Sequence, residues 1–516
     1  MENIFNIVWF KRDLRVSDHL PLFSASKDTI PFIPLYIFEE EYWKQKFSSL
    51  RHWSFVHDCL VELDNDLSIL GQPLIIKRGN SVDVFNKILT NFKIKKIFAH
   101  EETSNLWVKN RNTQVKNWCL TNSIELIECP TNGVVRNLIS RDNWSKIKNK
   151  RLQSEIILAP NKIKEIDNFS SDKISKNSIV FEDKSKVKIQ IGGRQNALNL
   201  LDNFLNKNGK LYLQNISSPK FSEKYASRIS PHLTWGTISS KEITKKIKIR
   251  KDNLTKEEKS YWQKNLTAFQ SRLSWRCHFI QKLEDDPSIE NSNMHTLFEG
   301  LREDGNSSLF YNAWKDGRTG YPFVDACMRN LTYEGWITFR MRAMLVSFAS
   351  YDLWLDWRIF GHHLAKLFTD YEPGIHYSQL QMQSGVTGIN TLRIYNPVKQ
   401  SKEHDENGEY IKKWVPELES LNSNWIHEPW KMSKELQISL NCEIGKDYPH
   451  PIIDHNVAIR IAKEKISKVQ KELEYKSIAK KVYLKHGSRS NANSNIFNDR
   501  SLKIKKQNQK KQLSLF

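Results

Sequence analysis

The 516-residue sequence predicts an α/β domain built on a doubly wound parallel sheet, followed by a large all-α domain. Two observations predict this class. Up to about residue 135, short and almost continuously apolar runs alternate with segments of helical periodicity, as in a sheet buried on both faces. From about residue 191 to 485, apolar residues recur at helical spacing and strand patterns are scarce. The chain is also too long for one hydrophobic core.

The first domain, residues 1–135, is expected to contain five strands, at Ile4–Phe10, Phe32–Phe38, Leu74–Lys77, Ile97–His100 and Ile124–Ile127. Between the second and third strands, apolar residues from Trp53 to Leu70 step by three and four, and Gly71 ends that helix. Ser81 is predicted to cap the next helix. Ligands of such sheets bind at the carboxyl ends of the strands.

A basic run, Lys11 to Arg15, follows the first strand. Its charges either line a crevice at the sheet edge or pair with Asp13 and Asp18, and the sequence favours neither alternative. Residues 136–190 are rich in Lys, Ser, Asn and Asp and predict a surface connector between the domains. Residues 486–516 form a basic, low-complexity tail that we expect to be disordered.

The formal net charge of +21 favours a polyanionic partner, most plausibly nucleic acid, over a merely solvated Lys-rich surface. The six cysteines show no spacing typical of a metal or iron–sulfur site, so reduced thiols and no metal are expected. No signal peptide opens the chain, and no apolar run approaches the ~20 residues that span a bilayer. We therefore expect a soluble, cytoplasmic monomer without a membrane partner.

Residues 313–400 combine aromatic residues, arginines within apolar helical patterns and a loop rich in Gly, Asn, Thr and Gln. Arg329, Arg340 and Arg342 need partners if their helices are buried, and Asp370 is the nearest convincing carboxylate. This composition predicts a pocket for a large, flat, anionic molecule. His362 and His363 lack metal-ligand spacing and are interpreted as structural.

Two further motifs are compatible with such a pocket. In Tyr225–Gly236, the hydroxyls of Ser227 and Ser230 and the charge of Arg228 suit a pyrophosphate, although a plain capped helix explains the same residues. In the segment 269–279, one helix face carries two arginines and two aromatic residues, suited to a base and a phosphate or to pairing with carboxylates such as Glu284; they are Arg272, Trp275, Arg276 and Phe279.

Several motifs in the same order resemble the cryptochrome/DNA photolyase family between residue 4 and about residue 430: NIVWFKRDLRVSDHLPL, SRISPHL, WRCHFI, GRTGYPFVDACMR, GWITFRMR, LWLDWR and RIYNPVKQ. The resemblance implies a Rossmann-like antenna domain followed by a helical domain that binds FAD. It implies light-driven electron transfer from reduced FAD to pyrimidine dimers in ultraviolet-damaged DNA. The alternatives are a cryptochrome-type photoreceptor that binds DNA without repairing it and, less favoured, a nucleic-acid-binding protein with a vestigial flavin pocket.

By this resemblance, matching positions assign three sets of site residues. Those expected to hold FAD are Tyr212, Ser227, Arg228, Ile229, Ser230, Phe269, Arg276, Arg342, Asp370, Glu372 and His376. Those expected to contact DNA are Arg272, Trp275, Arg340, Arg393 and Gln400. Catalytic roles fall to Trp275 and Arg340 in the dimer pocket and to Trp357 in electron transfer. A second antenna chromophore is possible, and its identity is left open.

The sequence also departs from the family pattern. Arg272 replaces the acid that contacts the dimer, and Ala226 replaces a threonine. Other pocket positions hold Phe339, Ala343, His376 and Met382. Of the three tryptophans that reduce the flavin only Trp357 is matched, with Leu380 and Asp304 at the other two positions. Another route or simple core packing is open for Tyr377, Trp314 and Trp354.

Overall fold

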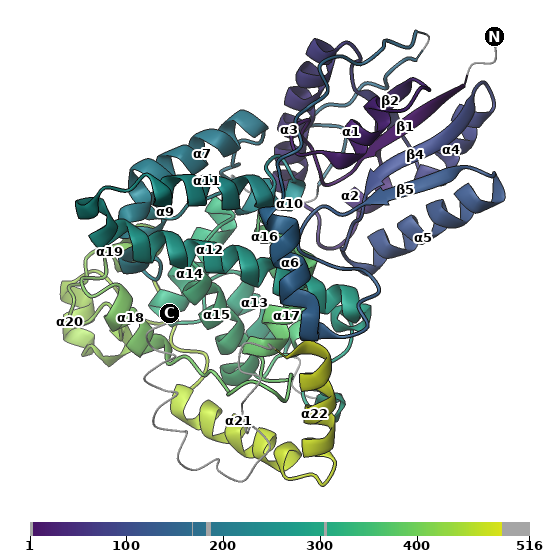
Figure 1. Ribbon diagram of the computed structural model, residues 1–516. Helices are drawn as coiled ribbons and strands as arrows, with labels where there is room; N and C mark the ends of the chain where they lie inside the picture. The colour runs from purple at the N-terminus through teal and green to yellow at the C-terminus, as the bar shows by residue number, and fades with distance from the viewer. Residues whose placement is uncertain (1–3, 168, 182–186, 304–306, 488–516) are drawn as a thin grey trace.

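A computed structural model describes residues 4–167, 169–181, 187–303 and 307–487. Figure 1 shows an α/β lobe formed by the first part of the chain and a larger helical lobe formed by the rest. The predicted fold class is confirmed. No helix in these described ranges is long and apolar enough to cross a membrane. Asp304 and the predicted basic tail from residue 488 onward lie outside the described residues.

The α/β lobe contains one parallel sheet in the strand order β3-β2-β1-β4-β5. The strands are β1 (Ile4–Phe10), β2 (Phe32–Phe38), β3 (Ile75–Arg78), β4 (Lys93–His100) and β5 (Glu125–Cys129). One face packs against α1 (Leu20–Ser26) and α3 (Leu50–Leu70), the other against α4 (Ser81–Leu89) and α5 (Leu106–Thr121). The short α2 (Glu40–Trp43) follows β2. The strand order reverses between β1 and β4, which places a crevice at their carboxyl ends.

Some predicted boundaries are corrected. Asn80, rather than Ser81, caps α4, because the Asn80 side chain accepts a hydrogen bond from the backbone N–H of Val82. Ser81 is the first helical residue, and its hydroxyl donates to Glu39 instead. β4 begins at Lys93, four residues before the predicted start, because Lys93 already pairs with Ile4 of β1. β3 is shifted by one residue toward its carboxyl end, and β5 begins one residue and ends two residues later than predicted.

The predicted connector is more ordered than its composition suggests. It contains α6 (Trp144–Gln153), which buries Trp144, Lys148 and Leu152 at intervals of four residues. Farther along, Ile163 and Ile179 are buried in the core on the α3 side of the sheet. Polar residues outnumber these anchors, so the helical period was not recognised. The domain limits at residues 135 and 190 stay predictions.

The helical lobe is built around a long, thirty-residue helix, α12. A capping box begins α12: Thr255 accepts from the backbone N–H of Glu258, and the Glu258 side chain accepts from the backbone of Thr255. The α-helices of this lobe are α7 (Arg194–Asn206), α8 (Tyr212–Asn215), α9 (Ser222–Tyr225), α10 (Ser230–Trp235), α11 (Ser240–Asp252), α12 (Lys256–Asp285), α13 (Ser308–Lys315), α14 (Pro322–Glu334), α15 (Phe339–Ser347), α16 (Trp357–Leu367), α17 (Pro373–Gln383), α18 (Pro397–His404), α19 (Glu409–Trp414), α20 (Lys434–Ser439), α21 (His455–Gln470) and α22 (Tyr475–His486).

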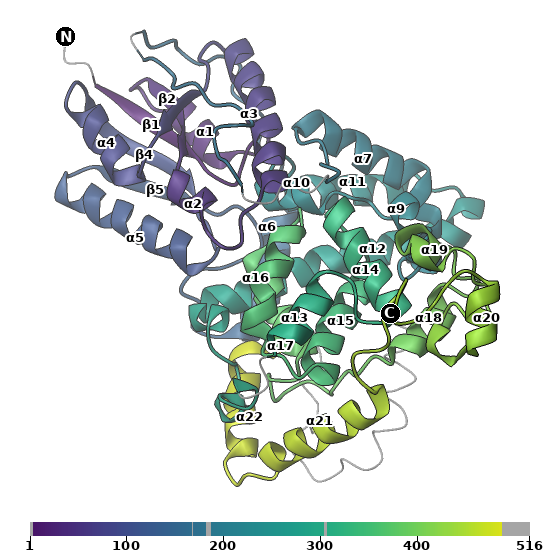
Figure 2. The ribbon, with the colours of Figure 1, turned by 180° about the vertical axis from the view of Figure 1, so that it is seen from behind.

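The two lobes are joined by hydrogen bonds as well as by chain connections. The imidazole Nε2 of His52, in α3, lies 2.7 Å from the backbone carbonyl oxygen of Phe368. Arg51, one residue earlier, donates to the carbonyl oxygen of Thr332. Figure 2 shows α3 beside the helical lobe. The His52 contact fixes the segment after α16, which leads directly into the candidate site, and the Arg51 contact fixes the end of α14 against the α/β lobe.

Candidate functional site

The helical lobe encloses a cavity of about 300 Å³, which we call the central cavity. Its wall is formed by α12, the segment around α9 and α10, the start of α15 and part of α17. A second space of about 80 Å³, the inner cavity, shares Phe339, Arg342, Asp370, Ile375 and Gln379 with it. Because they share these residues, the two spaces adjoin and form one site, of a size typical of small-molecule sites.

One face of α12 lines the central cavity. It carries Arg272, Trp275, Arg276 and Phe279, the four residues predicted to share a face. Neither arginine pairs with Glu284, which instead accepts a hydrogen bond from the Thr103 hydroxyl. The guanidinium of Arg276 lies 2.8 Å from the carboxylate of Glu372. The indole of Trp275 is 36% exposed, which marks one end of the cavity as open to solvent.

The predicted partner of Arg342 is found at the junction of the two cavities. Its guanidinium donates to both oxygens of Asp370, at 2.9 and 3.1 Å, and stacks on Phe368. Burial alone raises the pKa of Asp370, but the charge of Arg342 and hydrogen bonds from Arg342 and Ser230 outweigh it and lower that pKa below the ordinary value. Asp370 therefore stays ionised at neutral pH.

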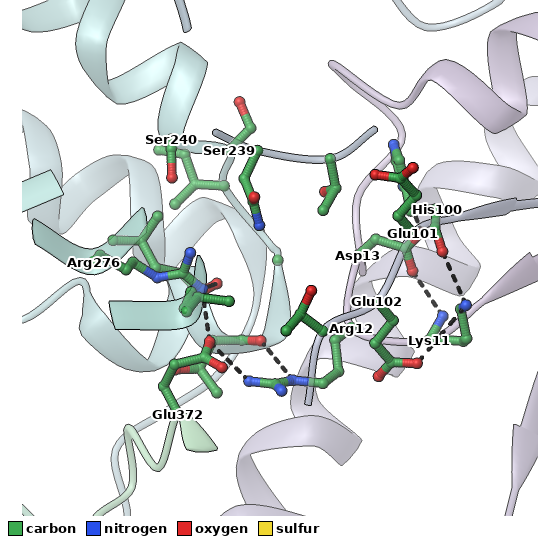
Figure 3. Close-up of a pocket in the computed structure, with 18 of the residues that line it drawn as sticks. Lys11, Arg12, Asp13, His100, Glu101, Glu102, Ser239, Ser240, Arg276 and Glu372 are labelled. Carbon is green, nitrogen blue, oxygen red and sulfur yellow. Dashed lines mark hydrogen bonds and ion pairs between the residues drawn. The ribbon is translucent and has the colours of Figure 1, made fainter. Parts of the chain in front are cut away.

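Glu372 ties the cavity wall to the α/β lobe. Its Oε2 atom lies 2.8 Å from Arg276 and 3.1 Å from Arg12, which follows β1 (Figure 3). Arg12 also donates to the hydroxyl of Ser104 and the carbonyl oxygen of Thr234. Burial lowers the pKa of Arg12, and the carboxylate of Glu372 more than restores it. Of the two predicted alternatives for the basic run, Arg12 fits the first: it lines a crevice, and its ion pair is with Glu372 rather than with Asp13 or Asp18.

Residues 226–230 form a turn along the cavity wall, and Ala226 to Ser230 all line the central cavity. Arg228 adopts a left-handed backbone conformation, with φ of 55°, and its guanidinium stacks on Trp336 at 4.4 Å. The backbone carbonyl oxygen of Arg228 accepts a hydrogen bond from Gln190. The helix that follows, α10, has only six residues, so its dipole is small. The hydroxyls of this turn and the charge of Arg228 are therefore the groups that suit it for binding a phosphate.

The inner cavity is mostly apolar but contains unpartnered polar atoms. His376 is buried and its Nε2 lies 2.9 Å from the carbonyl oxygen of Gly361. Burial lowers the pKa of His376 to about 3, so the ring is neutral and Nε2 donates to that carbonyl. Glu372 Oε1 and Gln383 Oε1 are buried without a hydrogen-bond partner in the described structure, and both residues line this cavity.

Most predicted cofactor residues come together here. Tyr212 and Phe269 also line the central cavity, and they pack edge to face. Glu372 and His376 line the inner cavity. The structure thus assembles the predicted set from chain positions between 212 and 376, although their contacts with a cofactor stay predictions.

Other predicted residues lie elsewhere. Arg329 lines neither cavity and pairs with Glu417 at 2.8 Å. Trp357 is buried, 1% exposed, and donates to Asn293 outside both cavities. Gln400 is only 7% exposed and donates to Glu403, and its contact with DNA stays a prediction. Arg393 lies near the end of α15, where its carbonyl oxygen accepts from Ser347.

Sequence reasoning missed a buried cluster at the sheet edge. His19 Nε2 and His100 Nδ1 lie 2.9 and 2.7 Å from the same oxygen of Asp13. The backbone N–H of Leu22 donates to His19 Nδ1, so His19 Nε2 carries the proton and donates to Asp13. A metal ion would need the lone pair of His19 Nε2, which would move the ring proton to Nδ1. The Nδ1–H would then face the backbone N–H of Leu22. The cluster is therefore read as hydrogen bonds that hold the turn after β1.

A parallel α/β domain joined to a helical domain with an arginine-rich, aromatic cavity defines a two-domain protein suited to a large anionic cofactor. Family models specify it further. The model of the DNA photolyase domain matches residues 6–140, and that of the FAD-binding domain of DNA photolyase matches residues 269–468. The chain belongs to the cryptochrome/DNA photolyase family, as its motifs predicted.

Relatives carry both kinds of name. A deoxyribodipyrimidine photo-lyase of Streptomyces griseus is 28% identical over 462 residues, 87% of this chain and 96% of that protein. The structure of a class III photolyase from Agrobacterium tumefaciens has a TM-score of 0.79 at 24% identity, covering 92% of this chain and 99% of that chain. A cryptochrome structure from Synechocystis has the same TM-score at 21% identity, covering 90% and 99%.

The residues present fit FAD. Its phosphates need cationic and hydroxyl donors, which Arg228, Ser227 and Ser230 provide. Its flat ring needs an apolar slot with a few polar atoms at the edge, and the inner cavity has buried, unpartnered oxygens on Glu372 and Gln383. The paired charges of Arg342 and Asp370 lie between the two parts.

Proposed function

We propose that this protein is a light-driven DNA lyase that cleaves pyrimidine dimers in ultraviolet-damaged DNA, with FAD held in the central and inner cavities. The observation that carries this proposal is the rim of the central cavity, defined as Arg272, Trp275 and Arg340. Trp275 is exposed, and neither arginine has a carboxylate within ion-pair distance in the described ranges. An exposed aromatic ring and two cations without a carboxylate partner suit a base and the neighbouring phosphates of DNA.

The residues of the site divide this work. Arg228, Ser227 and Ser230 bind the phosphates, while Tyr212 and Phe269 bound the central cavity. Arg342 and Asp370 orient the ring, and the apolar wall formed by Phe339, Leu380 and Ile375 excludes water. When bound, FAD would supply an electron on illumination and accept it back, so repair needs no net oxidant or reductant. A cyclobutane dimer would lose two carbon–carbon bonds, whereas a (6-4) photoproduct would lose one and return the transferred hydroxyl or amino group to C4 of the 3′ base.

The rim binds the lesion. Arg340 donates to the Ser217 hydroxyl at 3.2 Å, which leaves its other N–H groups available for a phosphate. Trp275 offers a ring face on which an unstacked base can lie. The net charge of +21 supports association with DNA through counterion release.

The experiment illuminates the reduced holoprotein with duplex DNA carrying a defined cyclobutane or (6-4) lesion and analyses the products. Restored pyrimidines, formed only in the light, are the expected result. If neither lesion is repaired while FAD is bound and DNA is retained, the lyase proposal fails.

A cryptochrome-type photoreceptor is the second candidate. No tryptophan lines the inner cavity of the described structure, where Leu380 and His376 stand, and Trp357 lies outside it. Electron supply to the ring is therefore altered in this chain, which favours signalling over turnover. Light-dependent spectral changes without lesion repair would support this candidate.

We also propose a second chromophore in the crevice at the sheet edge, where a cavity of about 380 Å³ lies between the ends of β4 and β5, α1 and α6. Polar residues line it, including His100, Thr131, Asn132, Arg151 and Lys241. A Thr131→Trp variant should obstruct part of it, removing a second pigment while FAD content stays the same. Release of FAD alone from the native protein on denaturation contradicts the proposal.

A further inference from the structure

The central cavity is lined by far more cationic than anionic groups. Its wall carries one carboxylate, that of Asp370. Both of its oxygens accept hydrogen bonds from Arg342. The five arginines of the wall are Arg228, Arg272, Arg276, Arg340 and Arg342. Within the described ranges, Arg272 and Arg340 at the rim form no ion pair. Whatever docks at the rim must bring the acceptors with it.

Arg272 has a defined place at the rim. Its guanidinium stacks on the indole of Trp275, 4.2 Å from the ring centroid. Its Nε is buried and has no hydrogen-bond partner among the described residues. A contact with the Tyr212 hydroxyl holds the side chain from the other side. The rim therefore presents an aromatic face beside a fixed group that can only donate hydrogen bonds.

The chemistry of pyrimidines determines which base suits such a group. The pairing edge of thymine places an N3–H donor between the O2 and O4 acceptors, so two parallel N–H groups of a guanidinium meet a donor there. Cytosine and the 3′ pyrimidone of a (6-4) photoproduct instead have a lone pair at N3 beside the O2 acceptor. Two adjacent acceptors match the guanidinium fork and allow a bidentate contact.

The edge becomes accessible when a damaged base leaves the helix. A lesion that is already unstacked and poorly paired is the cheapest to extrude. The guanidinium of Arg272 covers one face of the Trp275 indole, so the extruded base would pack against the exposed edge of that ring, with its pairing edge toward the guanidinium. Arg272 is in contact with the same indole and so is close enough to read that edge.

We propose that Arg272 makes the rim selective for dipyrimidine photoproducts whose docked base presents N3 and O2 as adjacent acceptors. These are the (6-4) photoproduct and the cytosine-containing cyclobutane dimer, both preferred over the thymine–thymine cyclobutane dimer. The inference rests on the proposed function, because it takes damaged DNA as the ligand at this rim. One bidentate contact gives roughly tenfold to hundredfold discrimination.

The test measures equilibrium affinity of the FAD-loaded protein in the dark, so that no lesion is consumed. Three duplexes of identical sequence context carry a thymine–thymine cyclobutane dimer, a (6-4) photoproduct or a freshly prepared cytosine–thymine cyclobutane dimer. An undamaged duplex gives the background. We expect the second and third duplexes to bind about tenfold more tightly than the first, and the two arms show which acceptor-bearing lesion is bound better.

Substitutions at position 272 separate charge from geometry. Arg272→Glu, an acceptor that suits thymine N3–H, should reverse the order of affinities. Arg272→Lys keeps the charge but loses the fork, and should reduce the preference about tenfold while the salt dependence stays. Arg460→Gln removes an exposed arginine of α21, away from both cavities, and should change neither.

Two outcomes overturn the inference. One is equal or tighter dark binding of the thymine–thymine cyclobutane dimer by the native protein. The other is loss of bound FAD from Arg272→Lys and Arg272→Glu, which would assign Arg272 to the cofactor phosphates through its contact with Tyr212. Failure of the proposed function looks different: light repairs no lesion, although the dark preference and FAD content are intact.

Discussion

The inner cavity and the rim of the same site differ in whether their charged side chains form ion pairs. Around the inner cavity, Asp370 is bonded to Arg342, and Glu372 to Arg276 and Arg12. At the rim, Arg272 and Arg340 have no carboxylate in the described ranges, and Trp275 is exposed. Buried charges need permanent partners, whereas half-buried charges such as these two stay partly hydrated until an anion binds. The difference indicates a resident molecule inside and a transient, anionic one at the rim.

The largest effect is expected from Asp370→Ala, which leaves Arg342 without its carboxylate. Breaking a buried ion pair costs about 3 kcal/mol at the low end of the usual range, and the low end applies because Arg342 is only partly buried. If this cost falls on cofactor binding, FAD should bind roughly a hundredfold more weakly. FAD content and affinity of the purified protein measure it.

Asp370→Asn keeps the shape and serves as a partial rescue. Glu443→Ala, which removes an exposed partner of Lys446, is the matched control and should change nothing. Normal FAD affinity in Asp370→Ala would end the distinction between the two regions.

The next effect is expected from Arg12→Ala, which tests whether the inner pairing depends on the α/β lobe. Arg12 loses hydrogen bonds to Glu372, Ser104 and Thr234, which together contribute about 2 kcal/mol. Both Tm and FAD affinity should fall, although Arg276 still pairs with Glu372.

Arg78→Ala removes an exposed pair with Glu40 in the same lobe and should change the free energy of unfolding by no more than about 0.5 kcal/mol, so Tm should be nearly unchanged. A lower Tm with unchanged FAD affinity in Arg12→Ala would show that the lobes are joined without any effect on the cavity.

Acid separates loss of the fold from loss of the inner pair. Burial lowers the pKa of His52 to about 4, below that of the unfolded chain near 6.5, so the unfolded chain binds more protons and stability falls as the pH decreases from 6.5 to 4. The pKa of Asp370 is lowered, so the stability from its pair is complete above its unfolded value near 3.8 and is lost only as the pH falls further.

The melting temperature should therefore decrease below pH 6.5 while FAD stays bound to the folded fraction. His52→Gln, which keeps a donor for the Phe368 carbonyl, should flatten that slope. Release of FAD at pH 5 from protein that is still folded would contradict the assignment.

The smallest effect is expected from Arg340→Ala. FAD content should be unchanged, because Arg340 lies at the rim and its hydrogen bond within the described residues is to the Ser217 hydroxyl, not to the Arg342–Asp370 pair. DNA affinity should fall uniformly across sequences, and the slope of log affinity against log salt should decrease by about one. A loss of FAD instead would move Arg340 from the rim to the inner group.

The sequence predicted those parts of the site that follow from local spacing. The shared face of Arg272, Trp275 and Arg276 needs only the helical period, and the pairing of Arg342 with Asp370 needs only a short separation of 28 residues. The link from Arg12 to Glu372 spans 360 residues, and no local pattern contains it. Arg329 was grouped with the pocket by proximity in sequence, whereas its partner Glu417 lies 88 residues away.

The fold was predictable to a similar degree. Runs such as Ile4–Phe10 are apolar enough to identify strands, whereas α6 depends on only Trp144, Lys148 and Leu152 among charged neighbours. The Asn80 cap was missed because two adjacent polar residues can both cap a helix, and only tertiary contact of Ser81 with Glu39 decides between them. Tertiary contacts, which the local sequence does not contain, account for these misses.

The unbroken course of α12 has a consequence for how the gene can change. Its first half packs through Trp262 and Leu266, and its second half brings Arg272 to the rim and Arg276 to Glu372. Inserting one codon between these halves rotates one against the other by about 100°, which turns the rim residues away from the cavity. Insertions and deletions should therefore be selected against at this point of α12. They should be tolerated only when their length is close to a whole number of helical turns, because only then do both halves keep their orientation.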